Sequence, residues 1–291
     1  TTGFQNTAVG SGALDANTTA GYNVAVGYNA LTDNTTGQVN SAIGWGALQR
    51  CTTGDNNVAF GGSALAYATT ASNNTAIGKD ALQATTTGTQ NVAVGTNALK
   101  VNTTANDNTS VGFNSLDSNT TGASNTGIGK GTLSDNVSGS DNTAVGKNSL
   151  NANTASNNTA VGSSALIANT SGSGNTALGK GSMLSSTTAS NNTAVGIDTL
   201  AAGTTAVNNT AVGAAALNQT TGDNNTAVGT FAMDANTSGI NNTGLGRGAL
   251  GSNTTAGNNV AVGYQSLTAN TTGTGNTAVG SEALDANTTG G

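Results

Sequence analysis

Residues 23–39 read NVAVGYNALTDNTTGQV, and close variants of this stretch fill the chain. Seventeen copies of the motif start between Asn6 and Asn276. Each copy starts 17 residues after the previous one, except that the steps from Asn142 and from Asn209 are 16 residues. With the leading Asn as position 1, the consensus is N-T-A-V-G-x-x-A-L-x-x-N-T-T-G-x-x. This internal repeat dominates every other signal in the sequence.

The length of the repeat indicates its fold class. A unit of 17 residues is too short for helical-hairpin repeats of about 34 residues or propeller blades of about 40. Gly at position 5 and the later Asn-Thr-Thr-Gly disfavour a helix. Two short strands, at positions 1–5 and around position 9, joined by turns fit instead. We therefore predict an all-β protein, a β-solenoid (parallel β-roll) of 17 coils forming one continuous array over residues 1–291.

Two positions are expected to face the core. Position 4 is always aliphatic or Phe, and position 9 is Leu except at Met183 and Met233. Strand side chains alternate between two faces, so position 3 lies opposite position 4. Position 3 is nonetheless almost always Ala, apart from Ser110, Gly127 and Gly244.

The invariance of position 3 suggests that its face is also packed. We predict that it lies between identical chains, with candidate oligomer-interface residues Ala76, Ala93 and Ala144. The alternative is that position 3 lines a narrow interior within one chain.

Position 1 is Asn in every copy. Stacked coils bring identical residues into register, and stacked Asn amides can donate to and accept from each other. We predict a structural Asn ladder whose central members are Asn74, Asn91, Asn108, Asn125 and Asn142.

Large residues collect at position 6, directly after the Gly. Four of them are aromatic and form a candidate surface contact ridge for a cell-surface glycan or protein receptor: Tyr28, Trp45, Phe113 and Tyr264. Exposed aromatic rings suit such contacts. The alternative is that a solvent-exposed turn position accepts any side chain.

The composition argues against enzymatic chemistry. The chain has no His and 7% charged residues, and no catalytic set recurs at a fixed repeat position. Its lone cysteine, Cys51, provides neither an intramolecular disulfide nor a metal cage. We expect no enzyme activity, no cofactor and no bound metal. The net charge of -6 without clustered Lys or Arg disfavours nucleic acid as a partner, and no apolar stretch approaches the roughly 20 residues of a membrane span.

The motif resembles the head repeat of YadA-like trimeric autotransporter adhesins, which reads roughly S/N-x-A-I-G-x-x-A-x-A. Residues 40–44 (NSAIG) and 74–78 (NTAIG) match it most closely. The resemblance implies a left-handed β-roll in which three chains wind around one axis. The longer unit is also similar to N-T-A-V-G-x-x-A-L-x-x-N-T-T-G arrays of phage tail-fibre-like and bacterial surface proteins. The repeat of 17 residues here is longer than the coil of the adhesin family.

Three functions fit these observations. The first is a non-enzymatic fibre or adhesin shaft of a phage tail or bacterial cell surface, a rod-like homo-oligomer, with the trimer as the expected state. The second is an extracellular filament subunit that polymerises end to end through uncapped solenoid ends. The third is an ice-binding solenoid, which would need Thr pairs on one outward face. All three place the protein outside the cell, at its surface or on a virion.

Overall fold

The computed structural model describes residues 2–291, which form an all-β, parallel β-solenoid of 17 strands and about 16 turns. The described residues contain no helix. The chain forms two compact units, Thr1–Ala144 and Val145–Gly291. Both units have the same fold, and one continuous array over residues 1–291 stays a prediction.

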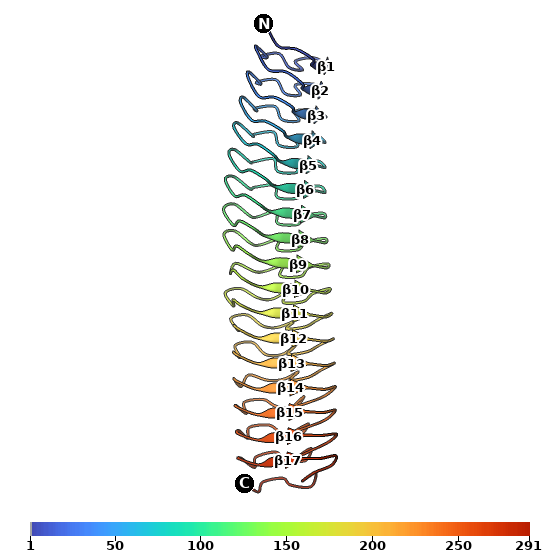
Figure 1. Ribbon diagram of the computed structural model, residues 1–291, viewed down its shortest axis with the longest axis vertical. Coiled ribbons are helices and arrows are strands. Elements are labelled where there is room, and N and C mark those ends of the chain that lie inside the picture. Colours follow the sequence, from blue (N-terminus) through green and yellow to red (C-terminus); the bar gives the residue numbers. More distant parts are fainter. Residues whose placement is uncertain (1) are drawn as a thin grey trace. The chain divides into compact units, whose positions relative to one another are not determined.

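Successive motif copies lie one turn of the solenoid apart, and each contains one strand at positions 2–4 (Figure 1). The first unit contains β1 (Thr7–Val9), β2 (Val24–Val26), β3 (Ser41–Ile43), β4 (Val58–Phe60), β5 (Thr75–Ile77), β6 (Val92–Val94), β7 (Thr109–Val111) and β8 (Thr126–Ile128). β9 (Thr143–Val145) spans the boundary. The second unit contains β10 (Thr159–Val161), β11 (Thr176–Leu178), β12 (Thr193–Val195), β13 (Thr210–Val212), β14 (Thr226–Val228), β15 (Thr243–Leu245), β16 (Val260–Val262) and β17 (Thr277–Val279).

Neighbouring strands within a unit pair in parallel, and equal repeat positions lie side by side. Between β5 and β6, for example, Ala76 lies beside Ala93 and Ile77 beside Val94. The backbone N–H of Thr75 donates to the carbonyl of Asn91 at 2.9 Å, and that of Gly95 to the carbonyl of Ile77 at 2.7 Å. This register makes every column of the solenoid a stack of equivalent residues.

The second strand predicted around position 9 is not present. Residues at positions 7 and 9 take left-handed backbone conformations instead, as at Asn97 (φ 60°) and Leu99 (φ 50°). Such residues cannot continue a strand, so this part of the coil is a series of turns. The side chain of position 9 still points inward as predicted, and Leu99 is completely buried.

The prediction that position 4 faces the core is wrong. Its side chains are exposed or half-exposed, and Phe60 reaches 56% and Leu178 46% exposure. Position 3 is inside: Ala76, Ala93 and Ala144 are completely buried within the single chain. These three residues are therefore not at an outward interface, and the alternative of a narrow interior within one chain is correct.

The reason lies in the strand's alternation and in the width of the coil. Positions 1 and 3 share a face, and the Asn at position 1 turns inward, where its amide binds backbone carbonyls. The same face then carries position 3 into an interior already occupied by Leu of position 9. Only a small side chain fits there, so Ala points inward and the larger Val, Ile, Leu or Phe of position 4 points outward.

The two glycines at position 3 compensate for larger neighbours. A Cβ atom on Gly127 would lie 2.8 Å from Oγ of Ser115 and 3.0 Å from Oγ1 of Thr132. A Cβ atom on Gly244 would lie 3.3 Å from two side-chain atoms of Met233, which replaces the usual Leu. Glycine thus keeps the packed volume of these coils nearly constant.

Gly at position 5 allows adjacent coils to approach each other. Gly95 has φ of +135°, and a Cβ atom there would lie 2.6 Å from the carbonyl oxygen of Gly112 in the next coil. Both the conformation and the contact exclude a side chain. This close approach explains why Gly occupies position 5 in all 17 copies.

Candidate functional site

The inward Asn side chains of position 1 form a hydrogen-bonded column. Oδ1 of Asn91 accepts the backbone N–H of Asn108 at 3.0 Å, and Oδ1 of Asn108 accepts that of Asn125 at 2.9 Å. Asn142 continues the column with a backbone bond of 3.1 Å to Asn125. Each Nδ2 also reaches the carbonyl of position 15 in its own coil, as from Asn91 to Ala105 at 2.9 Å. The predicted ladder exists, and it additionally binds the backbone of both the next coil and its own.

A second Asn column, which the sequence interpretation missed, runs along position 12. Nδ2 of Asn119 donates to Oδ1 of Asn102 at 3.2 Å and to the carbonyl of Gly122 at 2.9 Å. Asn136 repeats both contacts one coil further, at 2.9 Å each. The recurrence of Asn at position 12 was the available signal for this column.

The second column is interrupted once in each unit, by Ser186, Gly203 and Thr220 in the second unit and by Cys51, Ala68 and Thr85 in the first. Oδ1 of Asn34, before the gap, is buried and has no hydrogen-bond partner among residues 2–291, and the same holds for Oγ1 of Thr85. The Cys51 thiol contacts the carbonyl of Gly54 at 3.5 Å. Burial raises the pKa of this thiol to about 11, against the lowering effect of the Gly54 contact. Cys51 is therefore a buried and weakly acidic thiol.

The four aromatic residues of the predicted ridge are all exposed. Tyr28 and Trp45 stand on successive coils, but no contact between their rings is found in the described part of the chain. Phe113 carries the Lys130 ammonium over its ring, 5.7 Å from the centroid. Tyr264 carries the Arg247 guanidinium at 5.7 Å in the same way. The ridge thus consists of separate aromatic positions, two of them paired with a cation of a neighbouring coil.

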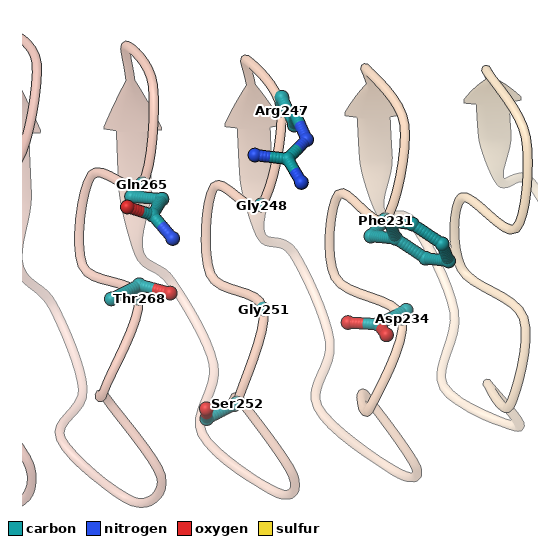
Figure 2. A pocket seen from close by; sticks show the side chains of 8 residues that line it. All are labelled: Phe231, Asp234, Arg247, Gly248, Gly251, Ser252, Gln265 and Thr268. Carbon is teal, nitrogen blue, oxygen red and sulfur yellow. The ribbon is translucent and has the colours of Figure 1, made fainter.

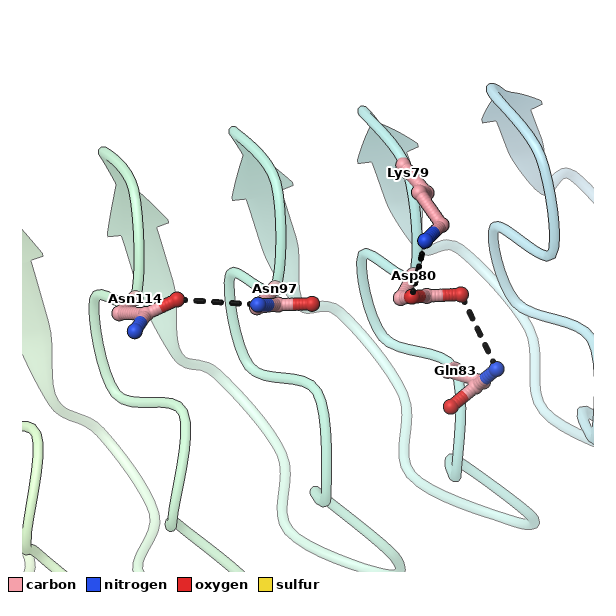
Figure 3. Close-up of polar contacts among 5 residues, drawn as sticks. All are labelled: Lys79, Asp80, Gln83, Asn97 and Asn114. Atoms are coloured by element: carbon pink, nitrogen blue, oxygen red, sulfur yellow. Dashed lines mark hydrogen bonds and ion pairs between the residues drawn. The ribbon is translucent and has the colours of Figure 1, made fainter.

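On the same face, polar side chains of positions 6, 7 and 10 often bind one another. Lys79 Nζ lies 3.7 Å from Oδ2 of Asp80, whose Oδ1 accepts a 3.1 Å hydrogen bond from Gln83 (Figure 3). One and two coils further, Nδ2 of Asn97 donates to Oδ1 of Asn114 at 3.0 Å. The polar side chains of this part of the face therefore bind one another, both within one coil, as at Asp80 and Gln83, and between coils, as at Asn97 and Asn114.

The second unit has a hollow on this face. Its volume is about 320 Å³, and three successive coils line it (Figure 2): Phe231, Asp234, Arg247, Gly248, Gly251, Ser252, Gln265 and Thr268. Asp234 is half-buried, and desolvation raises the pKa of its carboxyl above the usual value, against backbone N–H groups that lower it. The sequence interpretation missed this hollow. Its signal is the Gly pair at positions 7 and 10 of one coil, Gly248 and Gly251.

The outward face of the strands is a regular surface. Position 2 carries Thr, Val or Ser, and position 4 carries Val, Ile, Leu or Phe in every coil. Exposed aliphatic and β-branched side chains therefore follow one another along the strands of each unit. Scattered apolar residues are ordinary on a protein surface, but a contiguous series indicates a contact surface.

Within residues 2–291, no group of three or more His, Cys, Asp or Glu side chains is placed to hold a metal ion. No helix in that range is long and apolar enough to cross a membrane. No protein-family profile matches the chain, and no curated protein is significantly similar to it.

Proposed function

We propose that this protein is a non-enzymatic structural shaft, of a phage tail fibre or a bacterial surface adhesin, that assembles with copies of itself outside the cell. The observation that carries the proposal is the outward apolar residue at position 4 of every coil, which is exposed or half-exposed to solvent. In a lone chain these side chains would contact water in coil after coil. A second copy of the same chain offers an equally regular apolar surface to cover them.

The size of this surface fits a stable interface. One coil contributes a strip about 4.8 Å along the axis and about 10 Å across positions 2 and 4, or roughly 50 Å². The eight strands within each unit contribute roughly 400 Å², so the two units together offer roughly 800 Å², the area per partner of a standard protein interface. The resemblance to YadA-like heads makes a trimer the expected assembly, now with position 4 at the contact.

Mutating the outward face tests this proposal. Phe60→Glu with Ile77→Glu places two carboxylates on successive strands of the proposed contact. Both native side chains are exposed in the single chain, so the double variant is expected to fold and to sediment as a monomer of 27.8 kDa. The matched control is Thr104→Glu with Thr121→Glu, two exposed residues on a different face. A wild-type chain that sediments as a monomer at all concentrations would exclude self-assembly.

Ice binding is a second candidate, and it too has a structural basis. Six successive strands, β10 to β15, present Thr at position 2 and an aliphatic residue at position 4 outward. Position 4 nevertheless changes between Val and Leu within these strands, which makes the surface uneven and favours a protein partner over an ice lattice. Thermal hysteresis in the wild type that disappears in Thr193→Glu would support ice binding instead.

A further inference from the structure

The hollow described above owes its shape to missing side chains. Gly251 stands where other coils carry residues such as Gln49 or Gln83. A Cβ atom on Gly251 would lie 3.6 Å from Oγ1 of Thr268 and 3.7 Å from Oδ1 of Asp234. Any longer side chain at this position would extend between the two walls and fill the space.

The two walls are separated by one coil. Phe231 and Asp234 belong to the coil of β14, and Gln265 and Thr268 to that of β16 (Figure 2). Two coil spacings place these backbones about 10 Å apart, which leaves room between them for a single six-membered ring and its substituents. The volume of about 320 Å³ lies at the lower end of known ligand sites.

The polar groups of the walls have free hydrogen-bonding capacity. No side-chain hydrogen bond of Ser252, Gln265 or Thr268 to another described residue is found. Asp234 forms no ion pair within the described residues, and Arg247 at the rim donates a long 3.4 Å bond to the Tyr264 hydroxyl. This differs from Asp80, which Lys79 and Gln83 contact from both sides.

Phe231 is an unusual residue for its position. Its φ is 57°, and position 7 in other coils is typically Gly, Asn, Asp or Ser. A left-handed conformation costs a non-Gly residue about 1–2 kcal/mol, and the ring is 47% exposed, so burial offsets little of this cost. The same conformation recurs at position 7 of the other coils, so the aromatic side chain and not the backbone sets Phe231 apart. Phe231 is one of the residues that line the hollow.

We propose that the hollow binds one pyranose residue of a carbohydrate. The C–H face of the sugar ring packs on Phe231, as apolar faces pack on aromatic rings. The Asp234 carboxylate accepts sugar hydroxyls, while the Gln265 amide and the Arg247 guanidinium donate to them. Asp234 disfavours phosphate and other anions at the same place. This site does not depend on self-assembly, because its lining residues lie on a face other than that of position 4.

Saturation-transfer NMR of the whole chain with free glucose, galactose, mannose and N-acetylglucosamine tests the proposal. At least one sugar is expected to bind with a Kd on the order of 1 mM, which is weak binding. Gly251→Gln should abolish binding, because it fills the hollow with a residue that other coils accept at this position. Phe231→Asn should weaken binding about tenfold or more, as expected for the loss of a stacking contact.

Two controls separate binding from folding. Asn tolerates the left-handed conformation better than Phe, so Phe231→Asn should unfold at the wild-type temperature or above it, whereas a purely structural role predicts a loss of stability. Asp285→Asn changes the same repeat position outside the hollow and should leave binding unchanged. The proposal is overturned if none of the four sugars gives a transfer signal, or if Gly251→Gln binds as the wild type does.

Discussion

The side chain of Asn74 holds Asn91 of the next coil by two hydrogen bonds. Its Oδ1 accepts the backbone N–H of Asn91 at 2.9 Å and the Nδ2 of Asn91 at 3.1 Å. Its own Nδ2 donates to the carbonyl of Gly88 at 2.9 Å. One buried amide therefore binds the backbone and the side chain of the next coil and the backbone of its own coil.

Asn74→Ala is expected to destabilise the fold by about 2–5 kcal/mol, because it leaves the Asn91 N–H and the Gly88 carbonyl buried without partners. Urea unfolding followed by circular dichroism measures the loss. Gln219→Ala, at an exposed position, is the control and should change the unfolding free energy by less than about 0.5 kcal/mol. Equal effects of the two substitutions would show that the column contributes no stability.

Repairing the interrupted column should stabilise the protein. Cys51→Asn combined with Ala68→Asn supplies a donor to Asn34 and an acceptor to Thr85, whose buried atoms now lack partners. We expect a gain of about 1–2 kcal/mol for the double variant. Cys51→Asn alone should gain less, because its own Oδ1 would face Ala68. Additive single effects in thermal unfolding would contradict a continuous column.

Gly127→Ala should cost about 1–3 kcal/mol through overpacking against Ser115 and Thr132. The same substitution in a Ser115→Ala background should cost clearly less, because the closest clashing atom is gone. A double-mutant cycle of chemical unfolding measures this coupling. If the cost is the same in both backgrounds, space is not the reason for Gly at this position.

Asp234 is expected to make stability depend on pH. Its pKa is raised in the folded state by desolvation, so the folded state binds this proton more tightly than the unfolded chain does. The contribution of Asp234 to stability is therefore greatest below about pH 3.9, the pKa of Asp in an unfolded chain. It falls as the pH rises through the higher pKa that this group has in the folded state. Asp234→Asn should lack this loss and be more stable than the wild type at neutral pH. Asp285→Asn serves as the control for removing one carboxylate, and unfolding midpoints across acidic pH test the sign.

Cys51 should resist thiol reagents at neutral pH. The thiol is buried, and its pKa of about 11 leaves almost no reactive thiolate. Iodoacetamide labelling followed by mass spectrometry should be slow in the native protein and fast in guanidinium. The pKa of the Cys51 thiol is higher in the folded protein than in the unfolded chain, so the unfolded chain loses this proton first. The free energy of unfolding should therefore decrease as the pH rises toward 11. Rapid native labelling at neutral pH would contradict the burial of this side chain.

The sequence was sufficient to predict the coil, the Asn column and the inward Leu, because each depends on identical residues meeting in register. The prediction of which residue faces the core was wrong for Ala93 and Val94. Alternation places their side chains on opposite faces without saying which face is inside, and we assigned Val to the core because it is the more hydrophobic residue. Two signals pointed the other way. Position 4 varies in volume up to Phe60, which a stacked interior could not accommodate, and Ala93 shares its face with Asn91. The hollow at Gly251 was missed although Gly248 and Gly251 stand in the sequence, because its shape also depends on how the side chains of the two neighbouring coils are placed.

The ladders also determine how the gene can change in length. Almost every contact along them joins residues 17 positions apart, as from Asn74 to Asn91. Deletion of residues 91–107 would bring Asn108 against Asn74 with the same partners and geometry. Unequal recombination or replication slippage by 17 codons therefore yields a shorter or longer protein in which the buried Asn contacts are kept. The number of coils in such a protein can therefore change during evolution while the hydrogen bonds of the Asn columns are kept.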